Sequence, residues 1–320
     1  MLHNEDYTRI INYASRAPSS HNTQPWRFRL SHDIIRIIPD LSRSLPVVDP
    51  DNRALFISLG CALENLVIAA SRFGYSSKGC YAEHDAGIRV GLQRSVETKG
   101  DELFHYLKSR QVTRNLYRPE ELPTDQTETL RRITPEPGTE LQIYSREEGV
   151  KRFLPLVTEA GILQFRNQQF VEELVLWSRY SRREAMQTGD GIWSATLGIP
   201  SAGRWVGSLI MKHLVTPASE EKRLSKQVVH SGGFALLLAE KDNREHWIRT
   251  GRLYQRFGLT STGMGIRHAH LNMPVEEPVT RKKLAAVAGT VGSIPMLLLR
   301  FGYAERMPYS LRRNLHEIIE

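Results

Sequence analysis

The segment RAPSSHNTQPWRFRL, Arg16 to Leu30, joins a helix-like stretch to an alternating strand. The residues before Pro18 keep the apolar spacing of a helix, whereas apolar and charged residues alternate from Trp26 onward, as in a half-buried strand. Between them lie six residues with hydroxyl, amide or imidazole groups, closed by Pro25. Such a loop suits a neutral, planar ligand edged with C=O and N–H groups, or it only caps its own backbone.

Size and composition predict a folded chain with ample core. The 320 residues allow two ordinary domains or one large one, and 40% of them are apolar. We see no apolar run near the roughly 20 residues that cross a bilayer, and MLHNEDYTRI lacks the pattern of a secretory signal. We therefore expect a cytoplasmic protein without a membrane partner.

The charge distribution and the potential metal ligands argue against a nucleic-acid-binding protein and against a metalloprotein. The net charge is +8, but the 43 lysines and arginines are scattered, which favours a solvated basic surface with one anion site over nucleic-acid binding. Cys61 and Cys80 lack zinc-site spacing and are expected to be buried thiols. His268 and His270 form an H-x-H pair without a third ligand, so no metal is expected.

The order of elements is nearly repeated. Apolar periodicity predicts helices and strands in the same order twice, which favours two α+β layers related by a pseudo-twofold axis. In the first half we expect a helix at 6–16, strands at 26–30, 34–40 and 87–93, and a helix at 55–73 ended by Gly74. In the second half we expect helices at 124–133 and 247–259 and strands at 140–145, 233–240 and 295–305.

An insertion at 171–217 interrupts the second copy. It contains Trp177, Trp193 and Trp205 and many glycines, which is unusual for a plain connector. Loops of this length are uncommon unless they have a function. The segment is expected to be a lid or, alternatively, a subunit-interface arm.

Three segments carry a resemblance to a known family. APSSHNTQPW (17–26) resembles the P-S-x-x-N-x-Q-P-W signature of the FMN-dependent nitroreductases. The segments at 41–66 and 297–314 are similar to the Acg-like branch, whose double-length chains form what is usually a homodimer. The resemblance implies an α+β fold of two nitroreductase-like α/β/α halves, 1–108 and 109–320, in an intramolecular pseudo-dimer with the insertion as a lid.

The resemblance also implies one FMN per chain. The first half keeps the loop that grips the ring, and the second half keeps RQVTRN, which resembles the family's basic phosphate-binding start except at Val112. The counterpart of the ring loop, TPEPGTEL (134–141), lacks the Ser, Asn, Gln and Trp. The implied cofactor-binding residues are Pro18, Ser19, Ser20, Asn22, Gln24, Arg110, Thr113, Arg114, His270, Leu271, Arg312 and Arg313.

Within that set, His270 or Leu271 is expected to address flavin N5 through the backbone. No catalytic side chain is expected, because N5 carries the chemistry. Positive charge near N1 would stabilise the reduced flavin, with Arg16, Arg166 and Arg267 as candidates. No dinucleotide-binding loop is found, so NAD(P)H would bind transiently at the flavin face.

The expected function is hydride transfer from NAD(P)H through flavin N5 to a small electrophile, such as a nitro compound or a quinone. The alternative is an FMN-sequestering or storage protein with a closed lid and little turnover. The partner would be a small-molecule substrate, and the chain would be a monomer with an internal pseudo-twofold axis or a homodimer.

Overall fold

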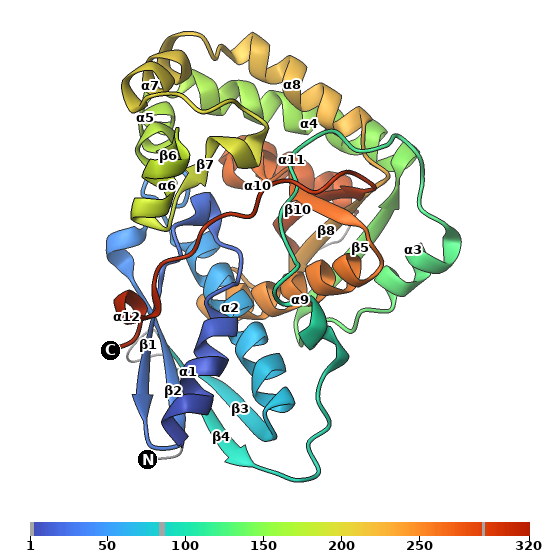
Figure 1. The fold of residues 1–320 in the computed structure, drawn as a ribbon. Helices are drawn as coiled ribbons and strands as arrows, with labels where there is room; N and C mark the ends of the chain where they lie inside the picture. The colour runs from blue at the N-terminus through green and yellow to red at the C-terminus, as the bar shows by residue number, and fades with distance from the viewer. Residues whose placement is uncertain (1–2, 83–86, 290–291) are drawn as a thin grey trace.

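The computed structural model describes residues 3–82, 87–289 and 292–320 and contains two four-stranded antiparallel sheets (Figure 1). The first sheet has the order β1-β2-β4-β3. Its strands are β1 (Trp26–Ser31), β2 (Ile34–Pro39), β3 (Tyr75–Ala82) and β4 (Gly87–Arg94). Alternation in β1 buries Trp26 and Phe28 and leaves Arg27 and Arg29 outside, as the sequence predicts.

The second sheet has the order β5-β8-β10-β9 and repeats the antiparallel arrangement. Its strands are β5 (Thr139–Ser145), β8 (Gly233–Ala239), β9 (Arg267–His270) and β10 (Ile294–Gly302). Every residue of β8 is buried, since helices cover both faces of this sheet. The α+β class is therefore correct.

Helices pack on both sheets. The first half contains α1 (His3–Ala14), α2 (Arg53–Arg72) and the short turns η1 (Ser20–Asn22), η2 (Leu41–Arg43) and η3 (Glu102–Tyr106). Along the second half lie α3 (Thr124–Arg131), α4 (Arg146–Arg166), α8 (Pro217–Val229), α9 (Arg244–Gly263), α10 (Met273–Glu276) and α11 (Pro278–Ala288).

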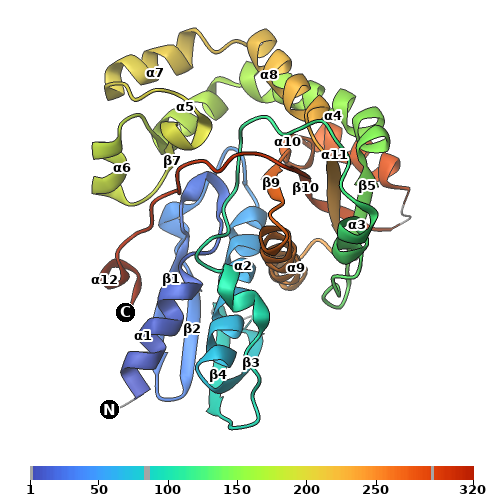
Figure 2. The ribbon, with the colours of Figure 1, turned by 45° about the vertical axis from the view of Figure 1, so that its right-hand side comes forward.

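Two long helices, α2 and α9, hold the halves together (Figure 2). Each has 20 residues, and each has glycine as its eighth residue, Gly60 in α2 and Gly251 in α9. A Cβ on Gly60 would lie 2.0 Å from the carbonyl oxygen of Ile248, and one on Gly251 would lie 2.0 Å from that of Ile57. Only glycine permits this backbone approach.

The position of α2 also corrects one sequence expectation. Among the helices of the described ranges it is the one long and apolar enough to cross a bilayer, although 83% of its most apolar window is buried inside the protein. Burial against α1, the first sheet and α9 accounts for its composition. Cys61 on this helix is buried as expected, whereas the side chain of Cys80 lies outside the described part of the structure.

The insertion folds into short elements on one side of the molecule, above the first sheet (Figure 2). They are α5 (Gln168–Trp177), β6 (Ser178–Arg179), α6 (Arg182–Thr188), β7 (Ile192–Trp193), η4 (Ser194–Leu197) and α7 (Arg204–His213). β6 and β7 pair in parallel over two residues.

The C-terminal tail returns from β10 to the first half (Figure 1). It ends in α12 (Leu315–Ile318), after which Ile319 forms a parallel bridge with Phe28 of β1. The backbone N–H of Glu320 donates to Phe28 O at 2.8 Å, and its carboxylate lies 2.6 Å from Arg29 Nη2. The last residues of the expected second half therefore pack on the first sheet.

Candidate functional site

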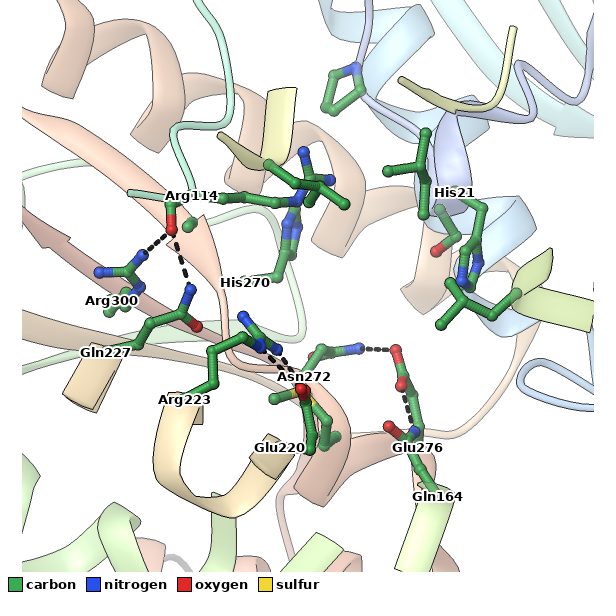
Figure 3. Close-up of a pocket in the computed structure, with 18 of the residues that line it drawn as sticks. His21, Arg114, Gln164, Glu220, Arg223, Gln227, His270, Asn272, Glu276 and Arg300 are labelled. Carbon is green, nitrogen blue, oxygen red and sulfur yellow. Dashed lines mark hydrogen bonds and ion pairs between the residues drawn. The ribbon is translucent and has the colours of Figure 1, made fainter. Parts of the chain in front are cut away.

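A cavity of about 590 Å³ lies where the two halves and the insertion meet (Figure 3). One wall is the loop after α1, with Pro18, Ser19, Ser20 and His21. α2 contributes an apolar strip that includes Ile57. The other walls come from the β9–α10 region and from the insertion. Large cavities with mainly apolar walls and a few polar groups are typical of small-molecule sites.

The loop after α1 has an unusual backbone. His21, Asn22 and Gln24 have φ values of 48°, 54° and 51°, in the left-handed region that L-residues rarely adopt. Such conformations persist only where surrounding contacts hold them, and they cluster at functional sites. One of these contacts is local, since the backbone N–H of Gln24 donates to Ser19 Oγ at 2.9 Å.

The other contacts come from distant segments. Asn22 Nδ2 donates to the carbonyl oxygens of Gly191 and Leu311, both at 3.1 Å. Gln24 Nε2 donates to Gly189 O at 2.8 Å, and Gln24 Oε1 accepts from the backbone N–H of Arg313 at 2.9 Å. Both amides therefore join the loop to the insertion and to the C-terminal tail.

The insertion is also fixed by buried ion pairs. Asp190 binds Arg43 and, at 2.6 Å, Arg179. Glu173 of α5 accepts hydrogen bonds from the backbone N–H groups of Val47 and Val48, at 2.9 and 3.0 Å. Residues of the insertion such as Leu174 and Ile192 line the cavity, so the insertion forms part of its wall.

A smaller pocket of about 60 Å³ adjoins the cavity and shares Pro18, Ser19, Arg114 and His270 with it. Arg110 and Arg312 line it from opposite ends of the second half. Arg312 Nη1 donates to Asn22 Oδ1 at 2.9 Å, and its Nη2 donates to the carbonyl oxygens of Arg16 and Ala17. The tail therefore brings a guanidinium to the loop.

The guanidiniums of Arg16, Arg110 and Arg312 lack countercharges. In the part of the chain that the structure describes, no carboxylate pairs with any of them, and the Nε atom of each is buried without a hydrogen-bond partner. Burial, reinforced by Arg110 and Arg16, lowers the pKa of Arg312 to about 9. Burial also lowers the pKa of Arg110. Clustered, buried cations are costly without an anion, so this pocket is suited to a phosphate group.

Two histidines face the cavity as neutral imidazoles. Burial is the main cause that lowers the pKa of His21 to about 4 and that of His270 to about 3, and Arg114 adds to both effects. At neutral pH they can donate or accept hydrogen bonds without adding charge. Within the described ranges, no group of three or more His, Cys, Asp or Glu residues is arranged to bind a metal ion.

The predicted residues fall into two groups. Those that line the cavity or the small pocket are Pro18, Ser19, Ser20, Asn22, Arg110, Arg114, His270 and Arg312. The others, Gln24, Thr113, Leu271 and Arg313, line neither. The backbone N–H of Leu271 donates to Leu298 O at 2.9 Å, and that of Thr113 donates to His268 O at 3.0 Å. Arg313 faces Asp40 and Glu317, at 3.8 and 3.7 Å.

Sequence reasoning missed two features of the site. The sequence suggests Arg16 only as a candidate near flavin N1, yet its Nε is buried in the cluster around Arg312, whereas neither Arg166 nor Arg267 lines the cavity. Glu276, which lines the cavity, accepts from Gln164 Nε2 at 2.7 Å, and burial raises its pKa. No sequence motif marks Glu276, because its environment is built from α4 and α10.

Sequence comparison identifies full-length relatives. Rv3131 of Mycobacterium tuberculosis is 25% identical over 97% of this chain and 90% of its own. The protein acg of the same organism is 24% identical over 96% of this chain and 93% of its own, and PigM of a Serratia species is 23% identical over 91% and 86%. All three are assigned provisionally, by name, as NAD(P)H nitroreductases.

Over nearly its whole length the chain is similar to proteins named as NAD(P)H nitroreductases, acg among them. No family model matches it. Solved structures similar to this chain include a nitroreductase-like family protein from Bacillus cereus, at 15% identity over 70% of this chain and 98% of that one, with a TM-score of 0.42. Another is the FMN-dependent nitroreductase NfnB from Mycobacterium smegmatis in complex with NADPH, at 17% identity over 68% and 96%, with a TM-score of 0.40.

Proposed function

We propose that this chain binds one FMN and catalyses hydride transfer from NAD(P)H to a small electrophile such as a nitro compound or a quinone. The observation that supports it most is the cluster of Arg16, Arg110 and Arg312, three arginines whose Nε atoms are buried and which lack countercharges among the described residues, beside a strained polar loop. The full-length relatives named as NAD(P)H nitroreductases support the same function.

The proposal assigns roles to the chain's own residues. Arg110 and Arg312 would hold the phosphate, with Arg16 adding positive charge, because guanidinium groups bind phosphate oxygens in a planar, bidentate manner. Pro18, Ser19 and Ser20 would contact the remainder of the cofactor from the loop, and Arg114 and His270 from the second half. Bound FMN would supply the hydride-accepting and hydride-donating centre at N5.

The residues that line neither pocket would act indirectly. Gln24 ties the loop to the insertion and the tail, and Asn22, which does line the small pocket, makes the same kind of contact, so both amides would position the loop. Leu271 and Thr113 would place their neighbours His270 and Arg114 through backbone hydrogen bonds. Arg313 would fasten the tail at Asp40, next to Arg312. The insertion would exclude water from the reacting groups.

We also propose one cofactor per chain, in a monomer with an internal pseudo-twofold axis or in a homodimer, located in the cytoplasm. The counterpart of the ring loop supports this stoichiometry. Residues 134–141 comprise part of the turn after α3 and the first three residues of β5, and they line neither the cavity nor the small pocket.

A storage or sequestering role is the second candidate. The buried ion pairs of Asp190 and the loop contacts of Gly189 and Gly191 hold the insertion over the site, which favours slow exchange. If the insertion stays closed, substrates would reach the flavin slowly and turnover would be small.

One experiment tests both roles. The purified protein is saturated with FMN and mixed with NADH or NADPH without oxygen, and its visible absorbance is followed. Rapid bleaching, reversed by a nitroaromatic compound or a quinone, supports the oxidoreductase. A yellow protein that neither reductant bleaches supports storage. A protein that binds no FMN, or binds two equivalents, contradicts the proposal.

A further inference from the structure

Exposed apolar side chains concentrate on the insertion. Of the thirteen large apolar side chains that are exposed among the described residues, eight lie between 176 and 214. They are Leu176, Met186, Ile199, Trp205, Val206, Leu209, Ile210 and Leu214. Scattered single apolar residues are normal on a surface, but a concentration of this kind marks an interaction site.

The helix α7 carries four of these eight side chains, and they face solvent instead of the protein interior. Gly207 is buried against Tyr180, whose Cδ1 would lie 2.2 Å from an added Cβ, and Met211, one turn later, lines the cavity. At 3.6 residues per turn, Trp205 and Leu209 fall on the opposite face, and Val206 and Ile210 lie along one side of the helix. All four side chains are exposed, so α7 presents a wide apolar surface to the outside.

The charge around this face is positive. Lys212 and His213 are exposed in the last turn of α7. No Asp or Glu occurs from Gly191 to Ser219. Arg204 at the start of the helix is paired with Glu184, so it adds little to the positive potential.

We propose that the outward face of α7 binds an anionic membrane surface. A short helix with an apolar face, a tryptophan and neighbouring basic groups is typical of interfacial helices, which lie in the plane of the headgroups. Figure 2 places α7 at the outer edge of the molecule, where a flat surface can reach it. The expectation of no membrane partner rested on spanning segments and does not bear on surface binding.

A second copy of the chain fits this face less well. A symmetric contact would bring Lys212 of both copies together without an acidic residue from the same segment. A ten-residue helix is also only about 15 Å long, which is short for an interface of roughly 800 Å² per partner. An anionic lipid surface meets both the apolar and the charged groups.

The test uses the full chain saturated with FMN. It is floated with vesicles of phosphatidylcholine alone and of phosphatidylcholine mixed with phosphatidylglycerol. We expect binding to the mixed vesicles and little to the neutral ones. The double variant W205A/L209A should bind the mixed vesicles about tenfold more weakly or worse, because two inserted side chains are removed. Lys212→Gln, which removes one positive charge, should weaken binding about fivefold.

Val279→Ala provides the matched control, since Val279 is an exposed apolar residue on α11, outside the insertion. It should bind like the wild type. Absence of binding to mixed vesicles, or equal binding by W205A/L209A, overturns the proposal. A second result would also overturn it: the wild type forms a dimer in analytical ultracentrifugation, W205A/L209A does not, and vesicles bind neither protein. The face would then bind a second copy of the chain.

Discussion

Arg110 shows what the sequence and the structure each contribute at one position. The basic segment RQVTRN resembles a phosphate-binding start, but only the fold shows that Arg110 is 5% exposed and that its Nε and Nη1 have no partner. Asn22 and Gln24 illustrate the converse. Their amides were predicted to bind a ligand, yet they bind Gly191 and Gly189, which are more than 160 residues away in sequence. Sequence patterns identify groups able to form hydrogen bonds but not the partners that the fold supplies.

The burial of Arg110 predicts opposite effects of its removal on stability and on FMN affinity. Arg110→Ala removes a buried cation that repels Arg312, so the protein without FMN should be at least as stable as the wild type. FMN binding should weaken about tenfold or more, because hydrogen bonds to charged groups contribute roughly 1.5 to 3 kcal/mol. Thermal unfolding and fluorescence titration measure the two effects. Arg132→Ala, at an exposed site, should change neither, and unaltered FMN affinity in Arg110→Ala would place the phosphate elsewhere.

The neutral histidines predict a dependence of stability on pH. The folded-state pKa of His270, about 3, lies below the ordinary value of 6.5, and that of His21 is about 4. Above about pH 7 neither folded nor unfolded chain binds these protons, whereas below about 6.5 only the unfolded chain does. Lowering the pH from 7 to 5.5 should therefore reduce the free energy of unfolding by about 1 kcal/mol per histidine. In His270→Asn, urea unfolding at the two pH values should show a smaller decrease, and an equal decrease would contradict the assignment.

At the scale of elements, long apolar or alternating segments were predictable and irregular ones were not. α2, β1 and β10 lie within a few residues of the predicted ranges. β3, with the sequence YSSKGCYA, was missed because it does not alternate. α4 was also missed, and it carries Pro155 inside the helix, where proline normally ends one. The short helices of the 171–217 segment were not predicted, because they are held by tertiary contacts such as Asp190 with Arg179.

The α2–α9 crossing gives a sharp prediction for one pair of elements. Gly60→Ala would place a Cβ 2.0 Å from the carbonyl oxygen of Ile248, so the two backbones must separate. We expect a loss of about 3 kcal/mol or more, at the upper end of overpacking effects, in chemical unfolding. Gly91→Ala in β4, where the nearest atom would be 3.9 Å away, should change stability by less than about 0.5 kcal/mol. Equal stability of the two variants would mean that the crossing tolerates a wider approach.

For the whole molecule, the tail determines whether the two halves form one site. Residues 303–320 follow the last strand of the second sheet, pass the small pocket at Arg312 and end beside β1 of the first sheet. Neither half alone contains Arg16, Arg110 and Arg312 together with the polar loop. The sequence indicated that the halves are complementary, and the return of the tail to β1 is the feature that it did not reveal.

A truncation after Tyr309 should therefore abolish FMN binding, because it removes Arg312 and leaves Asn22 without that partner. A chain that lacks only Ile319 and Glu320 loses the β1 contact but keeps Arg312, so it separates loss of the phosphate partner from loss of tail packing. In thermal unfolding, excess FMN should raise the melting temperature of the wild type and of this shorter deletion, and should leave the longer one unchanged. Should the longer truncation be too unstable to fold, Arg312→Ala in the full chain provides the same comparison. Stabilisation of the longer truncation by FMN to the same extent as the wild type would show that the phosphate binds without the tail.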